Sequence, residues 1–199
     1  MKYHFLGTFG ALATVIGITA TTARADVSFS ILSRAASGQE SQSSTARSTP
    51  NQPNRNLQST STPVMNSLEL TTHNLVNRYR QYRNLPPLAL DPAISAQAKA
   101  HSEEMARSSN MNHDGFNQRA ELVSKTIVYR SVAENVAFNA GHGQPDLVAV
   151  KGWIASPGHQ RNMLGQYDLT GIGVVQNAKG EYYFTQIFIR KAWYAKDAD

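Results

Sequence analysis

Apolar residues recur at helical spacing over several stretches of the last two thirds of the chain. The first stretch runs from Leu68 to Asn84, where Pro86-Pro87 ends it, and the second runs from Pro92 to about Asn110. Asp91 is expected to be the N-cap of the second helix, because proline then occupies its first turn. Three shorter helices are expected at 117–124, from Pro145 onward, and from Ser156-Pro157 to about Leu164.

Strand patterns follow mostly after the helices. An extended segment is expected at Ser131–Phe138, and two further strands at Gly171–Gln176 and Tyr182–Ile189. Asn177–Gly180 is expected to join the last two strands as a hairpin turn. Helices that come first and strands that come later favour an α+β arrangement with an antiparallel sheet over a doubly wound α/β fold.

The N-terminal third has a different character. Residues 1–25 combine Lys2, an apolar run and the ending Ala23-Arg24-Ala25, which is typical of a secretory signal peptide and not of a membrane-spanning helix. Residues 26–66 are expected to form a disordered linker rich in Ser, Thr, Gln and Pro, since such a composition cannot offset its ordering entropy. The domain is then expected at 67–194, followed by a short tail at 195–199.

Composition removes several classes of function. The 199 residues include no cysteine, which excludes disulfides, thiol catalysis and a lipoprotein signal. The formal charge is only +5, and the basic residues are spread along the chain without interleaved aromatics, so no nucleic-acid partner is expected. Once the signal peptide is cleaved, no transmembrane segment is expected, and the protein should be secreted, periplasmic or extracellular. The sequence does not indicate an oligomeric state.

Three polar segments at the edges of the expected elements carry candidate metal ligands, namely His113, Glu134 and His159. If Ser156 caps a helix, His159 lies in its first turn, where the helix dipole disfavours the imidazolium form. Two neutral imidazoles and a carboxylate would suit a divalent metal, zinc above all. The three residues are too distant in sequence to form a local motif, so spacing alone leaves open that the two histidines only cap or support their turns. His101, by contrast, is expected in the core.

Several motifs occur in an order that resembles the bacterial branch of the CAP superfamily, which comprises cysteine-rich secretory proteins, antigen 5 and pathogenesis-related proteins. The motifs run from about Leu70 to Ile189. They are Asn-Leu-Val-Asn-Arg-Tyr-Arg, Ala-His-Ser-Glu-Glu-Met-Ala, Asn-His-Asp-Gly, Ala-Glu-Asn-Val-Ala, Trp-Ile-Ala-Ser-Pro-Gly-His-Gln-Arg-Asn-Met-Leu, Gly-Ile-Gly-Val-Val and Tyr-Tyr-Phe-Thr-Gln-Ile-Phe.

The resemblance implies a three-layer α-β-α sandwich with a small central antiparallel sheet and a cleft lined by two histidines and two acids. His113 and His159 match the family's histidines, and Glu134 matches the glutamate of its Gly-Glu-Asn-type motif. The second acid is replaced by Ser156, which removes a candidate general base and weighs against catalysis, leaving Glu134 as the only candidate. Asn135 and Asn162 are expected to form hydrogen bonds that fix the loops carrying Glu134 and His159.

Three functions follow as hypotheses. The leading one is binding of a small amphipathic, lipid, glycan or cell-envelope ligand at the cleft, which the resemblance suggests. The second is a metal-dependent hydrolase acting on a peptide, ester or glycan, in which Glu134 serves as ligand or base. The third is an extracellular adhesion or signalling module.

Overall fold

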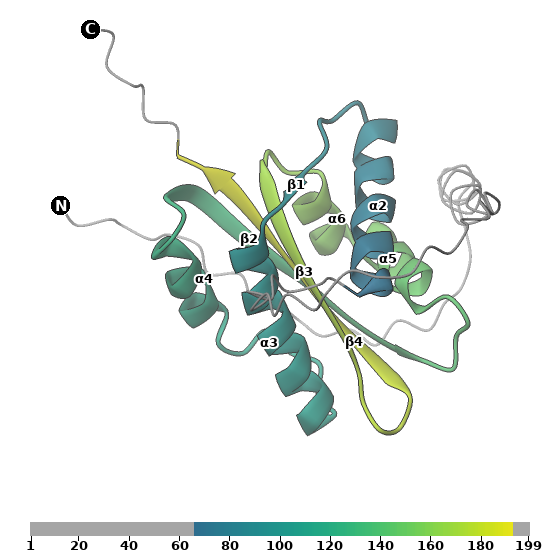
Figure 1. The fold of residues 1–199 in the computed structure, drawn as a ribbon. Coiled ribbons are helices and arrows are strands. Elements are labelled where there is room, and N and C mark those ends of the chain that lie inside the picture. The colour runs from purple at the N-terminus through teal and green to yellow at the C-terminus, as the bar shows by residue number, and fades with distance from the viewer. Residues whose placement is uncertain (1–65, 193–199) are drawn as a thin grey trace, which may run out of the picture.

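The computed structural model describes residues 66–192, which form helices on both faces of one sheet (Figure 1). In chain order the elements are α2 (Ser67–Tyr82), β1 (Ala89–Leu90), α3 (Pro92–Ser108), α4 (Phe116–Ser124), β2 (Tyr129–Ala140), α5 (Pro145–Ala155), α6 (Pro157–Met163), β3 (Leu169–Gln176) and β4 (Glu181–Lys191). The predicted signal peptide (1–25), the tail (195–199) and all of the predicted linker except residue 66 lie outside the described residues.

The sheet has the strand order β1-β3-β4-β2. The pairs β3–β4 and β4–β2 are antiparallel, and Glu134 of β2 lies opposite Ile187 of β4. β1 pairs parallel with β3 through two residues, a strand too short to leave a pattern in the sequence. The α+β class and the three layers are therefore confirmed, and the sheet is antiparallel apart from β1.

The helices divide between the two faces of the sheet. α3, with α4 beside it, covers one face, and α2, α5 and α6 cover the other (Figure 1). Observed ends agree with the expected ones within a few residues, because the local signals that set them are present. Asp91 Oδ1 accepts hydrogen bonds from the backbone N–H groups of Ala93 and Ile94 at the start of α3, and Pro92 occupies its first turn.

The start of α2 is fixed to the rest of the fold. Asn66 and Glu69 form a reciprocal capping box, in which each side chain accepts from the other residue's backbone N–H. Glu69 Oε1 also accepts from Lys99 Nζ of α3 at 3.1 Å and from the backbone N–H of Val174 of β3 at 3.1 Å. One buried carboxylate therefore joins both helical layers to the sheet.

The open edge of the sheet, strand β2, is partly covered by the second layer. The indole N–H of Trp153 in α5 donates to the carbonyl of Val136, and the amide of Asn162 in α6 donates to the carbonyl of Glu134. Carbonyls that an edge strand leaves without a strand partner are thus hydrogen-bonded by side chains. This cover holds α5 and α6 against the strand that carries Glu134.

The largest core cluster lies between the sheet and the α2–α5–α6 layer. Trp153, Val150, Phe184 and Phe188 are all buried within it, and smaller clusters lie beneath α3 and α4. Removing this apolar surface from water is the main source of stability in a chain without disulfides.

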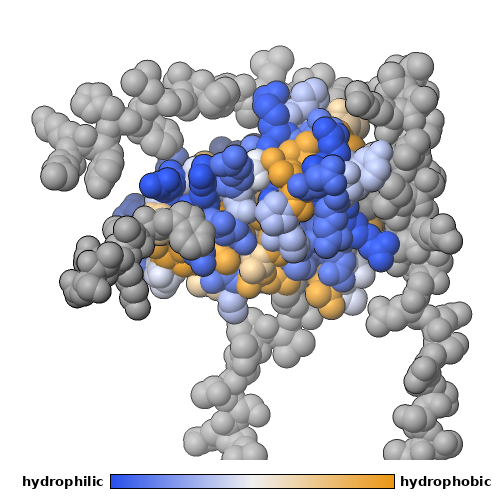
Figure 2. All heavy atoms as spheres, turned by 90° about the horizontal axis from the view of Figure 1, so that it is seen from above, coloured by the Kyte–Doolittle hydropathy of each residue, from blue (hydrophilic) through white to orange (hydrophobic). Residues whose placement is uncertain are grey.

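Polar and apolar side chains are mixed on the visible surface (Figure 2). On the face turned to the viewer in Figure 2, apolar side chains are found in separate groups among polar ones. The most exposed large apolar residue between 66 and 192 is Val128, with 53% of its surface accessible. Within the same range, no helix combines the length and the apolar character that crossing a bilayer requires.

Candidate functional site

Two consecutive residues of the edge strand β2 organise the site. Side chains alternate between the two faces of a strand, so Glu134 and Asn135 point to opposite layers. Glu134 contacts residues from the α3–α4 side, whereas Asn135 contacts α6 on the other side. The strand thus supports one candidate histidine from each layer.

Glu134 receives three N–H donors. Arg119 of α4 donates from Nε to Oε2 at 2.9 Å and from Nη2 to Oε1 at 2.8 Å, and His113 Nδ1 lies 2.9 Å from Oε1. The carboxylate side chain is only 2% exposed. Burial raises the pKa of Glu134, but the hydrogen bonds from His113 and Arg119 outweigh burial and hold this pKa below its usual value. Glu134 is therefore ionised at neutral pH.

The loop that carries His113 is held on both sides of the histidine. His101 of α3 contacts the carbonyl of Asn112 through Nε2 at 2.9 Å, and Arg119 Nη1 donates to the carbonyl of Asp114 at 2.6 Å. His101 is 2% exposed, which confirms its predicted place in the core. His113 itself is partly open to solvent, with 36% of its side chain accessible.

His159 lies in the first turn of α6, as predicted. Its backbone carbonyl accepts from Asn135 Nδ2 at 3.1 Å, and Asn162 Nδ2 donates to both Asn135 Oδ1 and the carbonyl of Glu134. Burial, and then the proximity of His113, lower the pKa of His159 below its usual value. The expected neutral imidazole is thus favoured chiefly by burial.

The fold brings His113 and His159 together across the edge of the sheet. Their ring centroids are 6.5 Å apart, and the ring planes are inclined at 35°. Asn135 and Asn162 hydrogen-bond to each other and to the backbone of the two segments that carry His159 and Glu134. Ser156 takes the predicted N-cap position of α6, but its side chain makes no cap hydrogen bond.

The two imidazoles fit a divalent metal better than the three-residue ligand set does. Two rings sharing one metal at N–metal distances of about 2 Å have centroids roughly 5–6 Å apart, so the observed 6.5 Å would have to shorten slightly for both rings to bind one ion. Both oxygens of Glu134 are already engaged by Arg119 and His113. Among residues 66–192, no three His, Asp or Glu side chains are grouped closely enough to hold an ion. Any metal would thus use the histidines directly, with Glu134 behind His113.

Arg119 is the functional residue that sequence reasoning missed. It lies on the inward side of α4 beside the buried residues Ala120 and Val123, and is itself buried. A cation in the apolar stripe of an amphipathic helix needs an anionic partner, and this was the available signal. The sequence could not say which carboxylate would be the partner.

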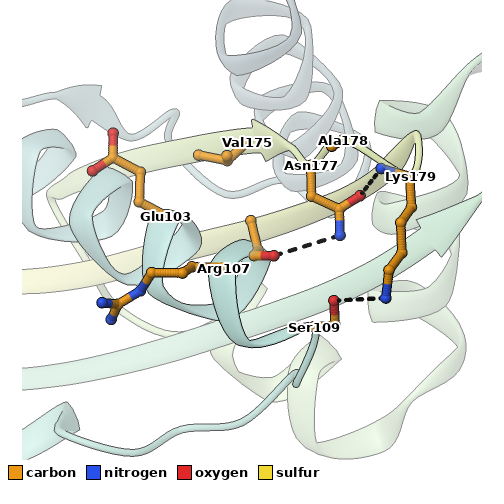
Figure 3. A pocket seen from close by; sticks show the side chains of 8 residues that line it. Glu103, Arg107, Ser109, Val175, Asn177, Ala178 and Lys179 are labelled. Carbon is orange, nitrogen blue, oxygen red and sulfur yellow. Dashed lines mark hydrogen bonds between the residues drawn. The ribbon is translucent and has the colours of Figure 1, made fainter.

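A separate shallow depression of about 410 Å³ lies between the end of α3 and the β3–β4 hairpin (Figure 3), and neither histidine lines it. Arg107 and Lys179 flank it, and Lys179 Nζ donates to Ser109 Oγ at 3.3 Å. The buried, interlinked side chains found around Glu134 are not among those that line it, so the histidine pair is the better candidate site.

Two known proteins from Bacillus subtilis are similar to the chain in sequence. The Bacillus subtilis protein YkwD is 32% identical over 121 residues, covering 59% of this chain and 45% of YkwD. The membrane protein YlbC of the same organism is 30% identical over 120 residues, covering 59% and 33% of the two chains. The chain therefore matches less than half the length of either relative.

Solved structures agree. An extracellular protein from Bacillus anthracis that contains an SCP domain superposes with a TM-score of 0.53 at 29% identity, covering 62% of this chain and 40% of that one. An outer surface protein from Borrelia burgdorferi shares the fold, with a TM-score of 0.53 at 18% identity over 60% of this chain and 90% of its own.

Residues 73–188 match the sequence profile of the family described as "CAP: Cysteine-rich secretory protein family". This range includes both histidines, Glu134 and Arg119, and the sheet and helices that hold them. The chain belongs to the CAP family.

Proposed function

We propose that this protein is an extracellular binding module whose His113–His159 cleft holds a divalent metal ion, zinc foremost, and presents it to an oxygen-rich cell-envelope ligand. The similar Bacillus anthracis protein is extracellular, which supports the location. The expected signal peptide supports it as well.

The observation that carries the proposal is the pairing of two imidazoles from opposite layers, one of which contacts the buried carboxylate of Glu134. His113 is held by Glu134, and His159 is kept neutral by burial, so both rings suit a metal ligand role. A metal on two histidines has open coordination positions, and such an ion binds carboxylate, phosphate or hydroxyl oxygens of a ligand. The partial exposure of His113 gives a ligand access to these positions.

The geometry favours binding over the hydrolase alternative. A general base must be free to accept a proton from water, whereas Glu134 is buried and accepts from two neighbours. Its low pKa also makes it a weak base. Position 156, where the resemblance implies a second acid, is a serine, so it supplies no carboxylate that could act as the base in place of Glu134.

Zinc titration of metal-free full-length protein by calorimetry tests the metal site. We expect one zinc ion per chain, and at least tenfold weaker binding in both His113→Ala and His159→Ala. His142→Ala, on an exposed turn after β2, serves as the control and should bind as the wild type does. Absence of zinc binding by the wild type, or wild-type affinity in both cleft variants, would refute the site.

The ligand half of the proposal has its own assay. Sedimentation with purified cell-wall fragments and with anionic phospholipid vesicles, each with and without zinc, should show zinc-dependent retention on one of these materials. Zinc binding without any retention would support the metal site but overturn the proposed role in binding cell-envelope material. Zinc-dependent cleavage of peptide, ester or glycan substrates would instead favour the hydrolase.

A further inference from the structure

We propose that Arg119 is the positioning residue of the cleft: it orients Glu134 so that His113 is protonated on Nδ1 and presents unprotonated Nε2 to the metal or ligand. The part of this inference that concerns metal affinity rests on the proposed function. The part that concerns the imidazole itself rests on hydrogen-bond geometry alone.

The first step is the orientation of the carboxylate. Arg119 and Glu134 meet in a bidentate pair, with 9% and 2% of their side chains exposed. The planar guanidinium fork contacts both oxygens, so it fixes the plane of the carboxylate as well as its position. A carboxylate held this way can accept a further N–H only from a limited set of directions.

The second step is the state of His113. An ionised carboxylate is only an acceptor, so the ring nitrogen that lies 2.9 Å from Oε1 must carry the proton. In the neutral ring the other nitrogen, Nε2, then has a free lone pair. Arg119 determines this tautomer without touching His113, because it holds the acceptor in place.

The third step is the backbone of the same loop. The third nitrogen of Arg119, Nη1, donates to the carbonyl of Asp114, the residue directly after His113. One side chain therefore fixes both the loop that carries the histidine and the carboxylate that the histidine contacts. The point charge of lysine could not make all three contacts at once.

The tautomer is measured in the metal-free full-length protein by long-range ¹H–¹⁵N correlation spectra of the histidine rings. The signals of His113 are assigned by their absence from the spectrum of His113→Gln. We expect the wild type to be predominantly Nδ1-protonated at this ring. Arg119→Met should shift the population toward the Nε2-protonated form, and Arg119→Lys should produce a smaller shift in the same direction. Arg107→Met, with 79% of its side chain exposed, is the matched control and should produce none.

Zinc affinity gives the second readout. Loss of a residue that orients a metal ligand typically weakens binding roughly 10–100-fold, and we expect this for Arg119→Met, with partial recovery in Arg119→Lys. A wild-type tautomer in folded Arg119→Met overturns the inference, as does a wild type that is mainly Nε2-protonated. If Arg119→Met does not fold, Arg119→Lys decides: an unchanged tautomer overturns the inference and a shift supports it.

The two proposals fail separately. A wild type that binds no zinc but shows the expected tautomer shift refutes the metal site and leaves the role of Arg119 standing. A wild type that binds zinc, with tautomer and affinity unaltered in folded Arg119→Met, refutes only the role of Arg119.

Discussion

At the scale of single residues, the fold withdraws several ionisable groups from water. Burial is the largest influence on His73, His101 and His159, and it lowers the pKa of all three below the usual value of 6.5. The unfolded chain therefore binds protons on these rings more readily than the folded chain does. Glu134 differs, because its hydrogen bonds lower its pKa against the effect of burial.

These shifts predict how stability depends on pH. As the pH falls below about 6.5, the unfolded state takes up protons first, so the free energy of unfolding should decrease, by at most about 1.4 kcal/mol per pH unit for each histidine. The contribution of Glu134 is present above pH 4.5 and is lost as the pH falls further through its lowered pKa. Urea denaturation at pH 7, 6 and 5 checks the histidine part, and His101→Gln should flatten the curve. An equal free energy at all three pH values would contradict it.

At the scale of elements, the contact between α3 and β3 depends on two glycines. A Cβ at Gly171 would come within 2.3 Å of the backbone of Ile94 and Ser95, and one at Gly173 within 2.3 Å of the backbone of Lys99. Backbone atoms cannot move aside as a flexible side chain can. The absence of side chains at these positions therefore sets how closely the helix approaches the sheet.

Gly171→Ala should accordingly lower the free energy of unfolding by about 1–3 kcal/mol, because α3 must shift outward. Gly152→Ala is a control that should instead raise the free energy of unfolding. Gly152 lies in α5 with open space where a Cβ would be, and alanine in a helix interior is favoured by about 0.5–1 kcal/mol. Chemical denaturation of both variants tests the pair, and a neutral or stabilising Gly171→Ala would show that the close approach is not tight.

At the scale of the whole molecule, Arg80 connects segments that are distant in sequence. Its side chain is buried within the fold and donates to the carbonyls of Pro86, Met163 and Gly165 at 2.7–2.9 Å. Two of these acceptors lie at the end of α6, the helix whose first turn carries His159. Arg80 therefore joins the end of α2 to the helix that completes the cleft.

Arg80→Met should lower the free energy of unfolding by about 3 kcal/mol, since three carbonyls lose a donor, that of Met163 in the interior. Arg80→Lys should recover less than half of the loss, because an ammonium cannot reproduce the guanidinium fork. Arg78→Met, two residues earlier on the exposed side of α2, should stay within about 0.5 kcal/mol of the wild type. Thermal and urea unfolding measure all three, and equal losses at positions 78 and 80 would contradict this role.

Much of the fold could be predicted from the sequence, because its signals are local. Asp91-Pro92 marks the start of α3 wherever the rest of the chain lies, and helical spacing indicates α2 without reference to its partners. The sequence did not predict β1, because its two residues become a strand only by pairing with β3. The three-layer arrangement came from resemblance and not from periodicity.

Apart from β1, the sequence by itself determined which elements form, and it determined which side chains are available for chemistry, since spacing, caps and side-chain type are properties of neighbouring residues. Only the tertiary structure decided which of these groups meet. The sequence predicts Glu134 as a metal ligand, and in the fold its oxygens accept hydrogen bonds from Arg119 and His113, two partners that the sequence could not name. The physical reason is that a hydrogen bond between distant residues depends on how strand and helices pack, and packing is set by the entire core at once.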